Sequence, residues 1–370
     1  MSNLLTRPQE NVDFSVVKQE PYTLLNPNGR VPTIVDPNTN ITLWESGAII
    51  EYLIETYDKE EKLSISSFPE KHHLRQFLHF QASGQGPYFG QAVWFAKFHP
   101  EDLPSAKERY VEQTVRVLSV LDKLLEGKEY LVGNKCTYAD IAFVNWNATA
   151  ENVILKSDWD EKVEKKYPNF VAWHRRVTER PIIKDENVDF SVVKQEPYTL
   201  LNPNGRVPTI VDPNTNITLW ESGAIIEYLI ETYDKEEKLS ISSFPEKHHL
   251  RQFLHFQGSG QGPYFGQAVW FAKYHPEDLP SAKERYVEQT VRVLSVLDKL
   301  LEGKEYLVGN KCTYADIAFV NWNAAAENVI LKPDWDEKVE KKYPNFVAWH
   351  RRVTERPIIK DVLQRQAAGR

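Results

Sequence analysis

The sequence predicts two near-identical units in tandem, each an α/β part followed by an all-helical part. β-branched runs are confined to the first third of each copy, and helical periodicity fills the remainder. Residues 10–185 recur as residues 186–361 with four differences: Ala82 against Gly258, Phe98 against Tyr274, Thr149 against Ala325 and Ser157 against Pro333. Such identity indicates either a recent gene duplication or a chain assembled from one gene, by a faulty gene prediction or by design.

The α/β part of the first copy contains a hairpin signal. Residues 14–17 form a short β-like run. Residues 31–35 and 41–44 are rich in β-branched residues and flank a turn sequence, Asp-Pro-Asn-Thr-Asn, so they predict an antiparallel pair of strands. An apolar helix is then expected to begin at Ser46 and end near Tyr57.

The helical part of the copy carries periodic apolar residues and one strong helix-start signal. Residues 111–125 predict a long amphipathic helix. Thr137 and Asp140 have the spacing of a capping box, and Cys136 and Ile141 have the spacing of a hydrophobic staple.

The repeat and these signals together define four predicted domains. The α/β domains are residues 10–62 and 186–238, and the helical domains are residues 70–185 and 246–361. Each copy is long enough to bury a core.

Charge and composition argue against several classes of function. The formal net charge is -7, and no cluster of Lys and Arg stands apart from the acids, so neither nucleic acid nor an anionic membrane is expected as a partner. The sequence contains no apolar stretch of transmembrane length and no apolar signal segment at its start. We therefore expect a cytoplasmic protein.

Cysteine and histidine usage gives no sign of a metal site. Cys136 and Cys312 are the only cysteines, one in each copy, and we expect both to be buried as small apolar side chains. The histidines of each copy do not cluster with carboxylates at ligand spacing, so no metal is expected; those of the first copy are His72, His73, His79, His99 and His174.

Three motifs in order resemble the cytosolic glutathione transferase superfamily. Residues 26–32 read NPNGRVP, residues 44–50 read WESGAII, and residues 137–142 read TYADIA in the helical part. Within the superfamily the chain is most similar to the fungal branch that includes the glutathione-transferase-like domain of the yeast nitrogen-catabolite regulator. The resemblance covers each copy from its second strand to its last helix, and it implies a truncated thioredoxin-like domain followed by a helical bundle domain.

This resemblance implies a glutathione site on the α/β part. The backbone of Val31, which precedes a cis Pro32, would hold the cysteinyl residue of glutathione. The γ-glutamyl carboxylate would bind Ser46 and the helix start, and the γ-glutamyl ammonium would pair with Glu45. Lys18 would lie near the glycyl carboxylate. The equivalent residues of the second copy are Val207, Pro208, Glu221, Ser222 and Lys194.

The family's electrophile pocket is lined by a helix that carries an aromatic stripe in this chain. A stripe at helical spacing is as often core as pocket, and both interpretations stay open here. The candidate residues are Tyr88, Phe89 and Trp94, with Gln85, Phe95 and Phe98 beside them, and Tyr264, Phe265 and Trp270 in the second copy.

Relatives begin with a strand and a helix whose connecting loop supplies the side chain that faces the glutathione sulfur. We expect this piece to be missing from both copies. Residues 1–9 precede the first copy, and residues 180–185 run directly into the second copy. The catalytic residue is therefore unknown, and the strand at residues 14–17 would need a new partner.

Three hypotheses follow for function. The first is a glutathione transferase that conjugates glutathione to a small electrophile or reduces a peroxide with it. The second is a non-catalytic glutathione-binding or regulatory protein, and the third is a defective product of the duplication. The two copies would dock as an intrachain pseudo-dimer, or the chain would form a homodimer.

Overall fold

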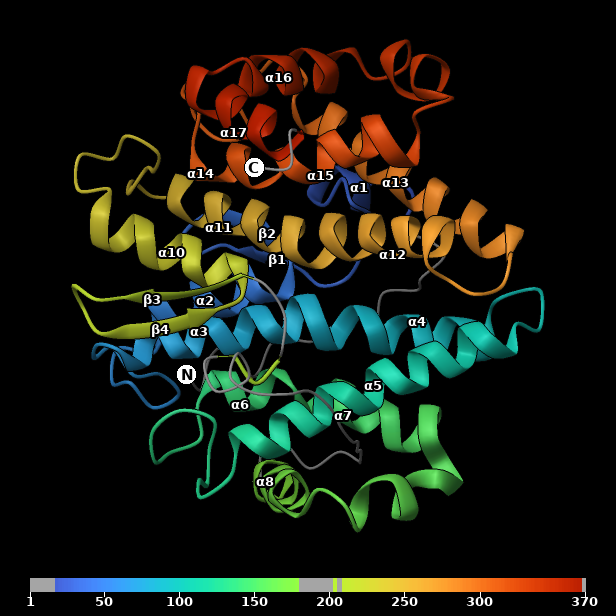
Figure 1. Cartoon of the computed structure of the whole chain (residues 1–370). Coiled ribbons are helices and arrows are strands. Elements are labelled where there is room, and N and C mark those ends of the chain that lie inside the picture. The colour runs from blue at the N-terminus through green and yellow to red at the C-terminus, as the bar shows by residue number, and fades with distance from the viewer. Residues whose placement is uncertain (1–16, 180–201, 205–207, 368–370) are drawn as a thin grey trace. The chain divides into compact units, whose positions relative to one another are not determined.

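A computed structural model describes residues 17–179, 202–204 and 208–367 (Figure 1). The chain divides into two compact units, and each unit draws on both copies. One unit combines Met1–Tyr57 with Thr232–Arg370, and the other consists of Asp58–Glu231. The α/β part of each copy therefore belongs with the helical part of the other copy. The predicted combination of a small sheet with helices is confirmed in both units.

In the first unit, the α/β part comes from the first copy and the helices that follow come from the second. The α/β elements are α1 (Tyr22–Leu25), β1 (Thr33–Asp36), β2 (Ile41–Trp44) and α2 (Ser46–Tyr57). The helices are α11 (Glu246–Phe256), α12 (Gly262–Lys273), α13 (Pro280–Leu300), α14 (Tyr314–Ala318), α15 (Val320–Ala325), α16 (Pro344–Thr354) and α17 (Pro357–Ala367).

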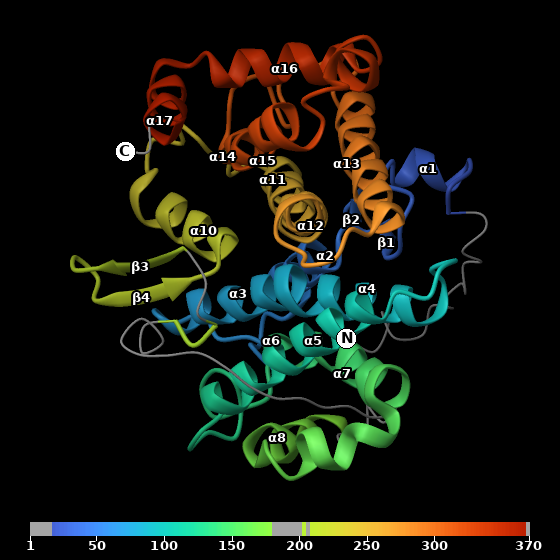
Figure 2. The same ribbon diagram turned by 45° about the vertical axis from the view of Figure 1, so that its right-hand side comes forward.

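The second unit has the reverse origin, with helices from the first copy and the hairpin from the second. The helices are α3 (Glu70–Phe80), α4 (Gly86–Lys97), α5 (Pro104–Leu124), α6 (Tyr138–Ala142), α7 (Val144–Thr149) and α8 (Pro168–Thr178). The α/β elements are β3 (Thr209–Asp212), β4 (Ile217–Trp220) and α10 (Ser222–Tyr233), and Figure 2 shows α10 beside its hairpin.

The predicted hairpin is present, although its first strand begins later than predicted. Thr33 pairs with Trp44 and Asp36 pairs with Ile41 in an antiparallel ladder. The strand predicted at residues 31–35 begins only at Thr33, because Pro32 has no N–H to donate to the ladder. Among the described residues, each unit holds a two-stranded sheet. The predicted strand at residues 14–17 and its repeat at residues 190–193 lie outside the described residues, apart from Val17.

The helix that follows the hairpin packs back onto it. Leu43 from β2 and Tyr52 from α2 are fully buried and belong to one apolar cluster with Ile41 and Ile49. The Tyr52 hydroxyl donates to the Asp36 carboxylate at 2.6 Å, so the buried phenol has a partner.

The predicted capping box is confirmed at the start of α6. The backbone N–H and the hydroxyl of Thr137 donate to the Asp140 carboxylate at 2.8 and 2.9 Å. Asp140 is fully buried, and it also accepts hydrogen bonds from the backbone N–H of Leu131 and the indole N–H of Trp173. Four donors around one carboxylate offset the cost of burying its charge.

The hairpin of the first unit is anchored to α11 by Trp44. This indole is 3% exposed and makes edge-to-face contacts with Phe253 and Phe256, at centroid distances of 6.1 and 5.1 Å. The Trp44 backbone N–H donates to the side-chain oxygen of Gln252 at 3.0 Å. An aromatic residue of one copy therefore fills a site built by the other copy.

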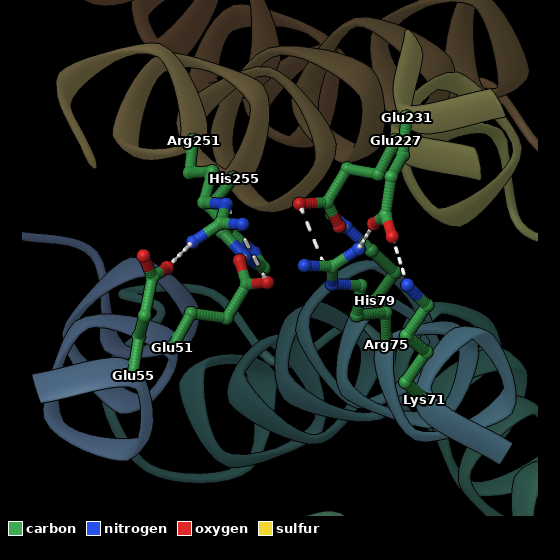
Figure 3. A network of polar contacts seen from close by, with 9 residues as sticks. All are labelled: Glu51, Glu55, Lys71, Arg75, His79, Glu227, Glu231, Arg251 and His255. Atoms are coloured by element: carbon green, nitrogen blue, oxygen red, sulfur yellow. Dashed lines mark hydrogen bonds and ion pairs between the residues drawn. The ribbon is translucent and has the colours of Figure 1, made fainter. Parts of the chain in front are cut away.

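Helix α2 lies close against α11 because residue 47 is glycine. A Cβ at Gly47 would stand 2.3 Å from the imidazole of His255. That imidazole hydrogen-bonds the buried carboxylate of Glu51 at 3.1 Å, and Figure 3 shows the two side chains pointing toward each other. The second unit repeats this arrangement with Gly223, His79 and Glu227.

Ion pairs flank this contact at the outer end of α2. Glu55 accepts hydrogen bonds from Arg251, at 2.6 Å, and from Lys247 (Figure 3). Partial burial opposes ionisation of Glu55, but the neighbouring cations outweigh it and lower the pKa of the carboxyl to about 2. In the second unit Glu231 pairs with Arg75 and Lys71 in the same way.

Substituting Gly47 by Ala should destabilise the chain. The added methyl group would overlap the His255 ring, and such overpacking costs about 1 to 3 kcal/mol of unfolding free energy. Gly258→Ala is the matched control because a Cβ there meets nothing within 4 Å and the other copy carries Ala82 at this position. Urea unfolding followed by circular dichroism measures both variants. Equal stability of Gly47→Ala and Gly258→Ala would contradict the packing of α2 against His255.

Candidate functional site

The first part of the candidate site is the turn that precedes β1. The side chain of Asn26 accepts a hydrogen bond from the backbone N–H of Asn28 at 3.0 Å and donates to the carbonyl of Arg30 at 2.6 Å. Gly29 has φ +59, which glycine adopts without strain. The NPNGRVP motif thus folds into a fixed turn that presents Val31.

Val31 lies at the end of this turn with its backbone outside the ladder. The residue is 44% exposed, and strand pairing begins two residues later at Thr33. Its peptide groups are therefore placed where an extended peptide could pair with them. Pro32 and the equivalent Pro208 are exposed.

The second part of the site is the junction between β2 and α2. Glu45 occupies this junction with φ +71, and Glu221 has φ +70 in the second copy. Left-handed backbone is uncommon for glutamate and is retained where the surroundings impose it. Ser46 follows as the exposed first residue of α2, and the next two residues, Gly47 and Ala48, are buried.

Hydrogen bonds hold both carboxylate oxygens of Glu45. The hydroxyl of Ser259, which lies just before α12, donates to one oxygen at 2.6 Å. The side-chain amide of Asn28 donates to the other at 3.3 Å. In the second unit Ser83 and Asn204 hold Glu221 at 2.6 and 3.2 Å.

Three cationic side chains gather at the turn that carries Asn28 and Gly29, namely Lys18, Arg30 and Arg292. Arg292 of α13 donates to the Asn28 side-chain oxygen at 2.5 Å, and Lys18 donates to the Gly29 carbonyl at 2.5 Å. Partial burial, with repulsion from Arg292 and Arg30, lowers the pKa of Lys18 to about 8. The site thus combines one acid with a cluster of positive charge.

Tyr264 of α12 packs between two of these cations. The guanidinium of Arg30 lies 5.0 Å from the ring centroid, and that of Arg292 lies 5.7 Å from it. Burial acts to raise the pKa of Tyr264, but the charges of Arg30 and Arg292 outweigh it and hold the pKa below its ordinary value. The aromatic ring therefore fixes both guanidinium groups.

The residues of the aromatic stripe, which the sequence allowed to be either core or pocket, differ in exposure. Tyr88 and Tyr264 are 8% exposed. Tyr88 lies 5.9 Å from Arg116, and Tyr264 lies beside Arg30 and Arg292. Phe89 and Phe265 are fully buried in the helical core. The half-buried members are Trp94 and Trp270.

Sequence reasoning missed Ser259 and Arg292, together with their equivalents Ser83 and Arg116. The sequence carries no local signal for them, because each lies in the other copy, far along the chain from the carboxylate it serves. Of the predicted second-copy residues, Val207 and Lys194 lie outside the described residues.

The described part of the chain contains no group of three or more His, Cys, Asp and Glu side chains placed to hold a metal ion. None of its helices combines the length and the apolar character that a membrane span requires.

Comparison with known proteins identifies relatives of both halves of each copy. The sequence profile described as "Glutathione S-transferase, C-terminal domain" matches residues 87–181 and 263–357. The profile described as "Glutathione S-transferase, N-terminal domain" matches residues 10–56 and 178–232. Most of the chain is thus covered by these two profiles, and both occur twice.

Several similar proteins come from fungi. The glutathione S-transferase-like protein gedE of Aspergillus terreus is 45% identical over 185 residues, covering 47% of this chain and 80% of that protein. The URE2 protein of Candida albicans is 33% identical over 199 residues, covering 44% of this chain and 56% of that protein. Ure2p5 from Phanerochaete chrysosporium, cocrystallized with 1-(S-glutathionyl)-2,4-dinitrobenzene, is 42% identical with a TM-score of 0.45, over 49% of this chain and 84% of that one. The predicted resemblance to the fungal branch is confirmed.

The two cysteines should be inert in the folded chain. Cys136 and Cys312 are 3% and 4% exposed, as predicted, and burial raises the pKa of Cys312 to about 11. Roughly a thousandth of such a thiol is ionised at pH 8. Ellman's reagent should therefore release almost no colour from the native protein and two equivalents after denaturation. Rapid reaction of the native protein would place a cysteine among the candidates for the sulfur chemistry of the site.

Proposed function

Because the chain belongs to the glutathione S-transferase family, we propose that it binds glutathione and transfers the glutathione sulfur to a small electrophile, or reduces a peroxide with it. A cytoplasmic location is part of this proposal. The proposed function involves no metal ion, no nucleic acid and no membrane.

The main support for the proposal is that the side chains of Glu45 and Ser46 lie next to each other at the start of α2. A carboxylate held at a left-handed junction stands next to the exposed start of a 12-residue helix. An amino acid head group carries an ammonium and a carboxylate on one carbon. The ammonium suits Glu45, and the carboxylate suits the Ser46 hydroxyl and the helix N–H groups. The γ-glutamyl end of glutathione has this chemistry.

The rest of the tripeptide can be placed along the turn before β1. The cysteinyl residue would pair with the backbone of Val31 in the manner of an added strand. The glycyl carboxylate would then approach Lys18, whose ammonium is already positioned by the Gly29 carbonyl. Sequence identity extends the same assignment to Val207 and Lys194.

An electrophile would lie against the aromatic face of the helical part. Tyr88 and Tyr264 are the members of the stripe that lie against arginine side chains, and Trp94 and Trp270 are partly accessible. Phe89 and Phe265 would support these residues from the core. An aromatic pocket favours a flat, apolar electrophile.

A second function is favoured by a specific feature of the chain. Helix α8 ends at Thr178, and the second copy begins at Glu186, so the stretch of sequence between them is too short for a strand, a loop and a helix. The sulfur-facing loop of the family therefore has no counterpart before the second copy. A site that holds glutathione without ionising its thiol would make the chain a glutathione-binding or regulatory protein.

Removing the acid of each site should weaken glutathione binding. Replacing Glu45 and Glu221 by Gln loses a charge-assisted hydrogen bond at each site, worth about 1.5 to 3 kcal/mol, or about a 10- to 100-fold rise in Kd. Glu60→Gln with Glu236→Gln is the matched control, because both side chains are more than three-quarters exposed, at 77% and 76%. Isothermal titration with glutathione measures the effect. Unchanged affinity in the Glu45 and Glu221 variant would remove these residues from the site.

The ionisation of bound glutathione separates the two functions. Without a sulfur-facing side chain, the bound thiol should keep a pKa near the free value of about 8.5, and turnover of 1-chloro-2,4-dinitrobenzene should be slow. Ultraviolet absorbance of the thiolate, recorded against pH with the protein in excess, measures this pKa. A value lowered to about 6 or 7 would contradict the expectation and show that another residue activates the sulfur.

A further inference from the structure

We propose that the outer edge of β1 is a docking edge for a second molecule of this chain, which adds its own β1 or β3 there as an antiparallel strand. The outer edge of β3 has the same role. This inference goes beyond the proposed function and does not require glutathione.

Side chains of α11 cover the outer edge of β2. This strand packs against α11, and the backbone N–H of Trp44 points out of the sheet and donates to the side chain of Gln252 at 3.0 Å. The imidazole of His249 hydrogen-bonds the backbone of Thr42. The peptide groups on this edge of the hairpin therefore have partners from the helical part.

The same contacts fix which peptide groups of β1 face outward. In an antiparallel ladder, the N–H and C=O of a residue both point either to the partner strand or away from it, in alternation along the strand. Trp44 pairs with Thr33, and Thr42 pairs with Val35. Because Trp44 and Thr42 point away from the ladder, Thr33 and Val35 do so as well. Each of these two residues offers an N–H and a C=O at the outer edge of β1.

The outer edge of β1 carries none of the features that usually block the addition of a strand. Among the described residues, β2 is the only strand that pairs with β1. The register from Thr33 to Asp36 has no bulge, and the strand contains neither Lys nor Pro. Val35 is 55% exposed, so an apolar side chain lies in water beside the outward peptide groups. An unprotected edge of this kind is a template for another strand.

This edge is complementary to itself. A second β1 in the antiparallel direction would pair its Val35 with Thr33 and its Thr33 with Val35, and each of these pairs would exchange both of its hydrogen bonds. The charges agree with this direction, because Lys18 and Arg30 belong to the turn before β1, whereas Asp36 ends the strand. Antiparallel pairing places the cationic end of one edge beside the acidic end of the other. A second molecule of the chain therefore suits both the peptide groups and the charges of the edge.

The second unit repeats the edge. β4 packs against α3, where the backbone N–H of Trp220 donates to the side chain of Gln76 at 3.0 Å, so β3 lies on the outside of its sheet (Figure 2). Val211 of β3 is 55% exposed, as Val35 is. Both edge strands read Thr-Ile-Val-Asp. Because every chain carries this edge in both units, one molecule can join two others, and the association is open-ended.

Analytical ultracentrifugation of the full chain at increasing protein concentration tests the proposal. The unaltered chain should form dimers and then larger species, and the association should be weak and reversible because each edge is only four residues long. Val35→Lys or Val211→Lys alone blocks one edge and should stop association at the dimer. The variant with both substitutions should be monomeric at every concentration.

Further variants show whether the effect belongs to the edge. Ile358→Lys adds the same charge at a 74% exposed apolar residue of α17 and should associate like the unaltered chain. Val35→Pro with Val211→Pro removes outward N–H groups that the ladders do not use, so it should give a monomer with an unchanged circular dichroism spectrum. A monomeric unaltered chain, undiminished association of the double lysine variant, or loss of association in Ile358→Lys would overturn the proposal.

Discussion

The close packing of α2 against α11, and of α10 against α3, is the contact on which the rest of each unit depends. A two-stranded hairpin with one helix cannot bury enough apolar surface to be stable alone. It gains that burial from the helical part, where Trp44 inserts between Phe253 and Phe256. Gly47 permits the approach, because any larger residue would meet the His255 ring.

The same contact brings the functional groups together. Glu45 and Ser46 lie at the start of α2, so docking this helix also places them beside Ser259. Because the acid and its hydroxyl partner come from opposite sides of the contact, a ligand that bridges them would stabilise the docked state by mass action. Ligand binding at the proposed site would thus be coupled to the docking of α2 on α11.

Local signals in the sequence predicted local structure well, and long-range pairing poorly. The capping box at Thr137 and the helix from Ser46 to Tyr57 were predicted correctly, because each depends on residues within a few positions. The exchange between copies could not be predicted, since near-identical copies present the same surfaces to either partner. Nor could the left-handed backbone of Glu45, because glutamate carries no preference for it and the constraint comes from the surrounding fold.

Because the two copies are joined in one chain, the contact between the α/β part of one copy and the helical part of the other needs less affinity than a contact between separate chains. Two separate copies would need affinity enough to overcome the entropy of association, whereas tethered copies meet at an effective concentration of about millimolar. The flanking ion pairs are partly exposed, with Glu55 at 38%, and pairs of this kind contribute only about 0 to 1 kcal/mol each. Such modest contacts suffice when the partner is covalently attached. Specificity then depends on the buried contacts, which are the packing of Trp44 on Phe256 and the Glu51 to His255 bond.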